Sequence, residues 1–492
     1  MSGMPQYRLD ARADVVEFAP GWELVVGLEV HTELLTVTKL FCRCRNDFGG
    51  APNRNTCPVC LGLPGSLPVV NRRAVEFAIR IGLALNCQVQ SSIFHRKNYF
   101  YPDMPKDYQI SQYDVPINAK GYLTLPSGAR IGIERAHIEE DTGKIVHRGG
   151  GGRIASSDAS LIDYNRSGIP LVEIVSSPDI ATPEQAREYV SELRAVLIAI
   201  GASDGKMEEG SLRVDANVSV RPTGSAELRT RCEIKNVNSL RSLGRAITYE
   251  AERQIALYEK GEAPLQQTRY WDEAKGVTGA LRSKEEAEDY RYFPEPDLVP
   301  LAPSDGWIAE IRSSLPMLPS GRRSYLLEKL AMSATNDQVE TALAEPLFPF
   351  VHEALERGVE PRVAVARAAN ELASLQPIPD SLDVDRFVTI CLKEAKGEVT
   401  ATQAKALISK AAESEVDIEE LIRTLGFERV DDSALRQMVE GVVGAHPEEW
   451  ARFVGGEAQL RGFFVGAVMK ASSGKADGKA VAAVLGELAA RG

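Results

Sequence analysis

Two polar residues interrupt an apolar segment near the start of the chain. The segment VVGLEVHTEL (25–34) has the composition of a buried β-strand, yet it contains Glu29 and His31. Because side chains alternate along a strand, these two residues share one face, and Leu28 and Val30 share the other. Burying a carboxylate and an imidazole is costly unless something compensates them. The segment therefore predicts a site for a metal ion or a cationic substrate.

Further acidic residues follow this pattern later in the chain. Glu173 lies inside the apolar run LVEIV (171–175), and Asp215 shares a face of its predicted strand with Asn217. Carboxylates that converge on one point repel each other and take up protons, whereas a divalent cation keeps them ionised. For any one acidic residue alone, the alternative is a solvated strand end. The other acidic candidates at strand ends are Glu139, Glu140, Asp141, Glu208 and Glu209.

The donor types indicate which metal ion such a site would prefer. Carboxylate oxygens suit Mg²⁺, which commonly holds ATP phosphates. An imidazole is a more natural ligand of Mn²⁺ or Zn²⁺. We therefore expect His31 to be a weak ligand or to lie just behind the ligands.

Four of the seven cysteines form two close pairs. Cys42-x-Cys44 and Cys57-x-x-Cys60 are separated by twelve residues, which is a typical layout for tetrahedral zinc. Four thiolates leave no open coordination position, so the predicted zinc site is structural and stiffens the loop after the Glu29 strand. The alternative is four reduced cysteines that pack as small hydrophobic residues.

The segment HRKNYFYPDMPKDY (95–108) interleaves cations with aromatic rings. Lys97, Tyr99, Tyr101 and Lys106 have the types that stack on a base or ribose and neutralise phosphate. The alternative is a loop whose aromatic rings cover the core.

Several common catalytic motifs are absent from the sequence. It contains neither a GxxxxGK[ST] phosphate loop nor a GxSxG nucleophile elbow. The Gly/Ser-rich motif of amidases, which contains Ser-Ser-Lys, is also missing. A chain of this kind that forms an amide would need ammonia from another source.

A mixture of strands and helices must position these residues. Since the two types do not alternate in a strict βαβ order, we predict an α+β fold with a mixed sheet. After Tyr290–Pro300, which has three prolines in its last seven residues, the sequence is nearly all helical. The predicted strands are 24–31, 130–140, 169–175 and 212–220, and the predicted helices are 71–86, 182–200 and 239–260.

Composition narrows the class of protein. The 492 residues are 44% hydrophobic and 26% charged, which is ordinary for globular proteins, and the formal net charge is −12. A nucleic-acid partner would therefore need a local basic surface. No apolar run approaches the ~18 residues of a membrane span, and residues 1–20 lack the apolar core of a signal peptide. These features predict a cytoplasmic protein.

Eight motifs occur together and in order, and they resemble one family. The chain is similar to the GatB family of bacterial aspartyl/glutamyl-tRNA amidotransferases, and the resemblance covers essentially the whole chain from Gly21. The sequence departs from the family pattern in two places. Residues 1–20 extend past the usual start, and the four clustered cysteines occur in only some members. The most specific motifs are GLEVH (27–31), RKNYFYPDxPKxYQISQ (96–112), DxNRxGxPLxEIVSxPD (163–179), KMEEGSLRxDANxS (206–219) and DYRYFPEPDLVP (289–300).

The resemblance implies an architecture and partners. It implies an extension at 1–20, a cradle domain at 21–300 with a zinc-binding insertion at 41–61, a helical domain at 301–410 and a YqeY-like helical tail at 411–492. It also implies a heterotrimer with an amidase partner, GatA, which releases ammonia from glutamine, and a small partner, GatC. The expected tRNA-binding surface in the helical parts includes Arg322, Arg323, Lys396 and Lys405.

The resemblance also implies an activity and a set of site residues. The expected reaction converts Glu-tRNA(Gln) to Gln-tRNA(Gln), or Asp-tRNA(Asn) to Asn-tRNA(Asn), through phosphorylation of the side-chain carboxylate by ATP and displacement of the phosphate by ammonia. The expected cofactors are ATP, Mg²⁺ or Mn²⁺, and a structural Zn²⁺ on the four cysteines. The implied metal ligands are Glu29, His31, Glu140 and Glu173, and further cofactor-binding candidates are Glu209 and Asp215. The resemblance also implies nucleotide, acyl-phosphate or tunnel-gate roles for Lys97 and Lys106, and it places Tyr99 and Tyr101 beside the nucleotide.

Two other functions stay open at this point. A free-standing ATP-dependent ligase that amidates a free amino acid would not need the helical residues after Pro300. A non-catalytic, zinc-bearing RNA adaptor would not need Glu29 or His31.

Overall fold

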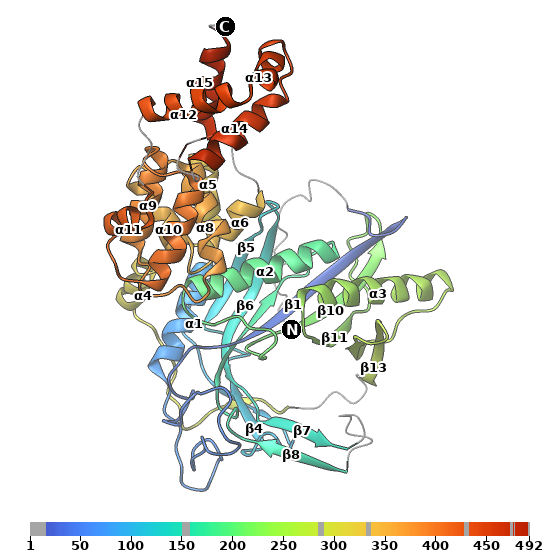
Figure 1. Cartoon of the computed structure of the whole chain (residues 1–492). Helices are drawn as coiled ribbons and strands as arrows, with labels where there is room; N and C mark the ends of the chain where they lie inside the picture. The colour runs from blue at the N-terminus through green and yellow to red at the C-terminus, as the bar shows by residue number, and fades with distance from the viewer. Residues whose placement is uncertain are drawn as a thin grey trace. The chain divides into compact units, whose positions relative to one another are not determined.

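The structure is a computed structural model that describes residues 16–149, 158–283, 290–330, 336–427, 432–472, 476 and 478–490. Most of the expected N-terminal extension, residues 1–15, lies outside this range. The chain divides into two compact units, Met1–Ser320 and Gly321–Gly492, and Figure 1 shows the course of both. The finer domain boundaries implied by the resemblance stay predictions.

The central strand of the first unit is the one that carries Glu29 and His31. This strand, β1 (Trp22–Glu33), pairs antiparallel with β10 (Leu212–Pro222) on one side and with β9 (Pro170–Ser176) on the other. The next strand beyond β9 is β6 (Arg130–Glu140). Segments that are far apart in the sequence thus become neighbours in the sheet.

These strands belong to a twelve-stranded mixed sheet. Its other strands are β2 (Gln88–Val89), β3 (His95–Asn98), β4 (Tyr108–Ser111), β5 (Asn118–Thr124), β11 (Cys232–Val237), β12 (Gln267–Asp272), β13 (Val277–Ser283) and β14 (Phe293–Pro294). The main order is β13-β12-β11-β10-β1-β9-β6-β4-β3-β14, and among the described strands only β11 and β12 pair in parallel. A separate hairpin consists of β7 (Lys144–Arg148) and β8 (Ala159–Asp163). The predicted α+β fold with a mixed sheet is confirmed.

Three helices cover one face of this sheet. They are α1 (Arg72–Ala84), α2 (Pro183–Ala199) and α3 (Leu240–Glu259), and each ends within two residues of its predicted limits. Each begins at the side-chain cap that fixes its start. α2 lies beside α3, α3 packs on β10, and α1 packs on β6 (Figure 1). A fourth helix, α4 (Asp305–Ser313), packs against α1.

The two faces of the central strand differ in character. Leu28 and Val30 are fully buried in the apolar cluster that the helices share with the sheet. Glu29 and His31 are partly exposed and project from the opposite face. The period of two in the sequence therefore separates a packed face from a face that is available for chemistry.

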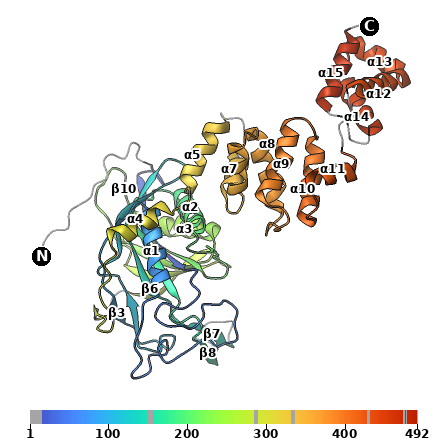
Figure 2. The ribbon, with the colours of Figure 1, turned by 90° about the vertical axis from the view of Figure 1, so that its left-hand side faces the viewer.

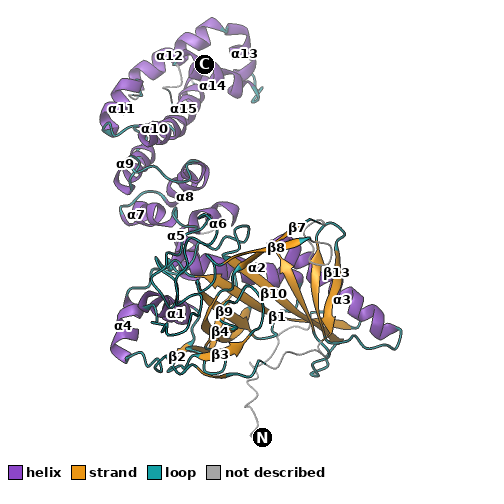
Figure 3. Ribbon diagram, turned by 90° about the horizontal axis from the view of Figure 1, so that it is seen from below, coloured by secondary structure: helices purple, strands orange, loops and turns teal. Residues whose placement is uncertain are grey.

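The second unit is helical in its described residues (Figures 2 and 3). It has two separate hydrophobic clusters, one drawn from Leu326 to Ile422 and the other from Leu435 to Leu485. None of the described helices combines the length and the apolar character of a membrane span. The helices are α5 (Pro319–Leu330), α6 (Asn336–Leu343), α7 (Phe348–Glu356), α8 (Pro361–Asn370), α9 (Val384–Ala395), α10 (Ala401–Glu413), α11 (Ile418–Leu425), α12 (Asp432–Ala445), α13 (Pro447–Val454), α14 (Leu460–Ala471) and α15 (Gly478–Ala489), with a short 3₁₀ turn at Leu372–Ser374.

Two of the arginines expected to bind tRNA have structural roles instead. Arg322 is buried, donates to the carbonyl of Leu343 at 3.0 Å and pairs with Glu345. Arg323 forms a two-pronged pair with Glu340, at 2.7 and 2.9 Å. Arg322 is too buried to reach a tRNA phosphate, and Arg323 is held by Glu340, whereas Lys396 and Lys405 are exposed.

Candidate functional site

Strand pairing places a row of polar residues across the open face of the sheet. His31 of β1 lies opposite Glu173 of β9, and Glu173 lies opposite His137 of β6. On its other side, His31 lies opposite Arg213 of β10. Directly opposed residues point to the same face, so these four side chains are neighbours.

Three of the nearby side chains have the geometry of a metal site. The Nε2 atom of His31 lies 3.7 Å from Glu139 Oε1 and 3.9 Å from Glu173 Oε2. One donor atom from each of the three residues lies within 4.8 Å of the others. An ion with bonds of about 2.1 Å holds neighbouring ligand atoms roughly 3 to 3.5 Å apart, so a small contraction would suffice. We call His31, Glu139 and Glu173 the sheet trio.

The electrostatics of the sheet trio favour a cation. Burial, together with the charge of Glu173, raises the pKa of Glu139 to about 8. Burial lowers the pKa of His31 to about 4, which leaves its imidazole neutral with a free lone pair. Burial likewise lowers the pKa of His137, whose Nε2 lies 3.3 Å from Glu173 Oε2. Two carboxylates held close together beside neutral imidazoles gain from a divalent ion.

Glu29 lies beside the sheet trio, two residues before His31 on the same face of β1. Its Oε1 accepts a hydrogen bond of 2.9 Å from the side-chain amide of Asn217. Burial, and then the charge of Glu173, raise the pKa of Glu29. The sequence-based expectation placed Glu29 in the ligand set, whereas the geometry places it at the edge of that set.

Glu140 was expected among the same ligands, and the structure does not bring it there. Its carboxylate pairs with Lys106 and accepts a hydrogen bond of 2.9 Å from the backbone N–H of Ile110. Adjacent residues of a strand point to opposite faces, so Glu139 shares the face of His31 and Glu140 does not. The spacing of two between His137 and Glu139 was the signal in the sequence that would have identified Glu139.

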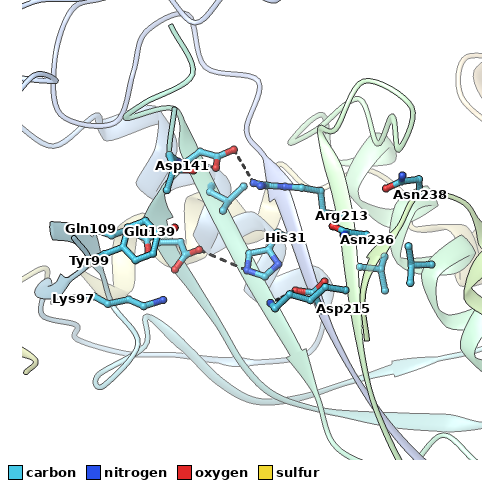
Figure 4. A pocket seen from close by; sticks show the side chains of 15 residues that line it. His31, Lys97, Tyr99, Gln109, Glu139, Asp141, Arg213, Asp215, Asn236 and Asn238 are labelled. Carbon is cyan, nitrogen blue, oxygen red and sulfur yellow. Dashed lines mark hydrogen bonds and ion pairs between the residues drawn. The ribbon is translucent and has the colours of Figure 1, made fainter. Parts of the chain in front are cut away.

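A cavity of about 360 Å³ opens beside the sheet trio, and His31 and Glu139 contribute to its lining (Figure 4). Its other lining residues include Arg213, which donates to Asp141 at 2.7 Å. Lys235 also lines it and donates to Asp215 at 2.8 Å. This volume lies in the usual range for small-molecule sites. The sequence had not identified Arg213, because a lone arginine in a strand carries no local signal.

The other predicted site residues divide between this cavity and the surface. Lys97 and Tyr99 line the cavity, and Tyr101 stacks on Tyr99 with its ring centroid 5.4 Å away. Glu209 does not line the cavity and instead pairs with Lys206 at 2.9 Å. Lys97 and Tyr99 thus stay candidates for nucleotide binding, and Glu209 loses its support.

The four clustered cysteines converge as their spacing predicts. The four Sγ atoms all lie within 4.8 Å of one another; they belong to Cys42, Cys44, Cys57 and Cys60. The Sγ atoms of Cys57 and Cys60 are 3.9 Å apart. Tetrahedral zinc with bonds of about 2.3 Å separates its sulfurs by roughly 3.8 Å, so the residues fit such an ion. This cluster is able to bind a metal such as zinc.

Comparisons with known proteins identify the family of the chain. Residues 24–309 match the GatB/GatE catalytic domain, and residues 363–488 match the GatB domain. The first match contains both candidate metal sites and nearly the whole sheet. These matches define the class of protein, which is a catalytic chain of the GatB/GatE type.

Relatives of known function match nearly the full length of the chain. The B subunit of the aspartyl/glutamyl-tRNA(Asn/Gln) amidotransferase from Carboxydothermus hydrogenoformans is 45% identical over 471 residues, which are 94% of this chain and 97% of the relative. The protein of the same name from Frankia casuarinae is 47% identical over 481 residues, 94% of this chain and 95% of the relative. This chain belongs to the GatB family of tRNA amidotransferase components, which form part of multi-subunit, glutamine-hydrolysing ligases that form C–N bonds.

Proposed function

We propose that this chain uses ATP to activate the side-chain carboxylate of Glu-tRNA(Gln), Asp-tRNA(Asn) or both, and amidates it with ammonia from a partner protein. The observation that carries the proposal is the sheet trio at the edge of a cavity that also contains Arg213 and Lys235. A pocket with a cation site and fixed positive charges suits a triphosphate.

The sheet trio would hold a divalent ion, Mg²⁺ or Mn²⁺, with Glu29 beside it. Three protein donors leave positions for phosphate oxygens and water. When bound, such an ion supplies charge neutralisation for a phosphoryl group in transfer. His137 would support the site, because its Nε2 lies 3.3 Å from Glu173 Oε2 and 3.8 Å from Glu139 Oε2.

The remaining polar residues of the cavity would orient the two reactants. A carboxylate oxygen of the aminoacyl side chain attacks the γ-phosphorus of ATP, and ADP leaves. Ammonia then attacks the carbonyl carbon of the acyl phosphate and loses a proton, and inorganic phosphate leaves. Arg213, Lys235 and Lys97 would hold phosphate oxygens in place during both steps, which lowers the entropic part of the barrier.

Lys106 and Glu140 would act separately from the phosphate chemistry. Both line a second, smaller cavity of about 60 Å³, and Glu140 and Glu139 are adjacent residues that point to opposite faces of β6. Of the roles expected for Lys106, this position favours a gate on the path of ammonia from GatA. The absence of amidase motifs from the sequence supports such an external source.

Substrate and partner binding complete the proposal. The chain would act in a heterotrimer with GatA and GatC, and the exposed Lys396 and Lys405 would contact tRNA phosphates. Zinc on the four cysteines would stiffen the loop between β1 and α1.

An isotope-transfer experiment tests the proposed reaction. The complex with GatA and GatC is given ATP, glutamine and Glu-tRNA(Gln) whose γ-carboxylate contains ¹⁸O. We expect one ADP for each amide formed, and one ¹⁸O atom in the released phosphate, because the carboxylate oxygen leaves with it. Unlabelled phosphate, or AMP as the product, would contradict activation through an acyl phosphate.

A further inference from the structure

The turn that follows the second cysteine pair presses directly against Lys106. Gly62 adopts φ +64°, and its N–H donates to the carbonyl of Val59 at 3.0 Å. A Cβ atom on Gly62 would lie 2.5 Å from Cγ of Lys106 and 3.1 Å from its Cα and Cβ. The backbone at Gly62 therefore packs on the aliphatic stem of Lys106, with no room for a side chain between them.

The residue before the first cysteine pair reaches the same lysine. The Nζ atom of Lys106 lies 5.8 Å from the centre of the Phe41 ring and 5.2 Å from that of Tyr108. Phe41 directly precedes Cys42 in the chain. Both flanks of the cysteine cluster thus touch Lys106, one on its stem and one near its ammonium group.

Glu140, the partner of Lys106, is linked to the cluster through Gly168. A Cβ atom on Gly168 would lie 3.7 Å from Cβ of Cys60 and 3.8 Å from Oε2 of Glu140. The carbonyl of Gly168 accepts a hydrogen bond of 2.8 Å from the N–H of Leu40. Cys42 and Cys60 line the same small cavity as Lys106 and Glu140.

We propose that the cysteine cluster, when it holds a metal ion, positions Lys106 against Glu140, with Gly62 and Phe41 as the contacts that transmit this order. A lysine stem has four rotatable bonds, and packing on Gly62 and Phe41 restricts them. Four metal–thiolate bonds fix the loop that provides both contacts, whereas thiols hold it only by weak hydrogen bonds. The cluster then acts on the ion pair as well as on stability. The expected effect on activity rests on the proposed function, in which Lys106 and Glu140 form a gate for ammonia. The positioning of Lys106 itself does not depend on that role.

Two glycines of the same turn provide a matched pair of variants. Gly62 and Gly65 both have positive φ, +64° and +84°, so alanine strains the backbone at either position. No atom lies within 4 Å of a Cβ atom placed on Gly65, whereas a Cβ atom on Gly62 collides with Lys106. Gly65→Ala therefore controls for backbone strain and loss of stability.

The first readout is the reactivity of the Lys106 amine, measured by mass spectrometry after brief acetylation of the full complex. In Gly62→Ala we expect Lys106 to be acetylated about fivefold faster than in Gly65→Ala, because its ordered packing is lost. In the unaltered protein, removal of the metal with a chelator should raise the same rate by a similar factor. Lys120, far from the cluster in the sequence, serves as the internal reference.

The second readout is the choice of nitrogen donor. Gly62→Ala should lower glutamine-dependent amidation by about tenfold more than it lowers amidation with ammonium chloride, and Gly65→Ala should lower both equally. The proposal is overturned if both variants acetylate Lys106 at one rate, or if metal removal leaves that rate unchanged. If the acetylation rates differ as expected while donor choice does not, the positioning stands and the gate role of the pair fails.

Discussion

We expect His31→Ala to lower ATP-dependent amidation of misacylated tRNA by about 10³-fold, with glutamine or with ammonium chloride as the nitrogen donor. The substitution removes one of the three donors of the sheet trio and leaves two buried carboxylates without a shared cation. Glu173→Gln should have a similar effect, because Glu173 lies opposite both His31 and His137 in the sheet. The measurement is the rate of ADP and amide formation by the proposed complex with GatA and GatC.

Glu209→Gln is the matched control for this prediction. The sequence also made Glu209 a candidate, yet its side chain pairs with Lys206 outside the cavity. We expect its activity to stay within about twofold of the unaltered protein, since surface ion pairs contribute little. Full activity in His31→Ala, or an equal loss in Glu209→Gln, would show that the sheet trio is not where the chemistry occurs.

The neighbouring carboxylates Glu139 and Glu140 should behave differently when each is changed to glutamine. Glu139→Gln removes a donor of the sheet trio and should lower amidation by about 10²-fold with either nitrogen donor. Glu140→Gln breaks the pair with Lys106 on the other face of β6 and should lower the glutamine-dependent reaction by about 10²-fold, with a much smaller loss for ammonium chloride.

Each of the two variants is the control for the other, because both change a glutamate to glutamine at adjacent positions of β6. Both variants must bind GatA and GatC and retain the same circular-dichroism spectrum. If Glu140→Gln loses activity with both donors and Glu139→Gln does not, the assignment of the two faces is wrong.

Periodicity in the sequence predicted a substantial part of this fold. The alternation in VVGLEVHTEL separated the apolar face from the face with Glu29 and His31, and the predicted limits of α1, α2 and α3 lie within two residues of the observed ones. The spacing of the cysteines also predicted their convergence. All of these signals are local, since they depend on residues close together in the chain.

The composition of the candidate site could not be predicted in the same way. Glu173 and His31 are neighbours only because β9 lies between β1 and β6, an order that no local pattern encodes. Arg213 enters the cavity for the same reason, through the pairing of β10 with β1. The resemblance implied Glu140 rather than Glu139 because a motif match does not indicate which face of β6 each residue occupies.

Locating the bound ion tests whether the sheet trio holds it. Crystals of the complex grown with Mn²⁺ and a non-hydrolysable ATP analogue would be measured at a wavelength where manganese scatters anomalously. We predict an anomalous peak within about 2.5 Å of Nε2 of His31 and of a carboxylate oxygen of both Glu139 and Glu173. Bound nucleotide with its manganese elsewhere, for example beside Glu140, would contradict the account.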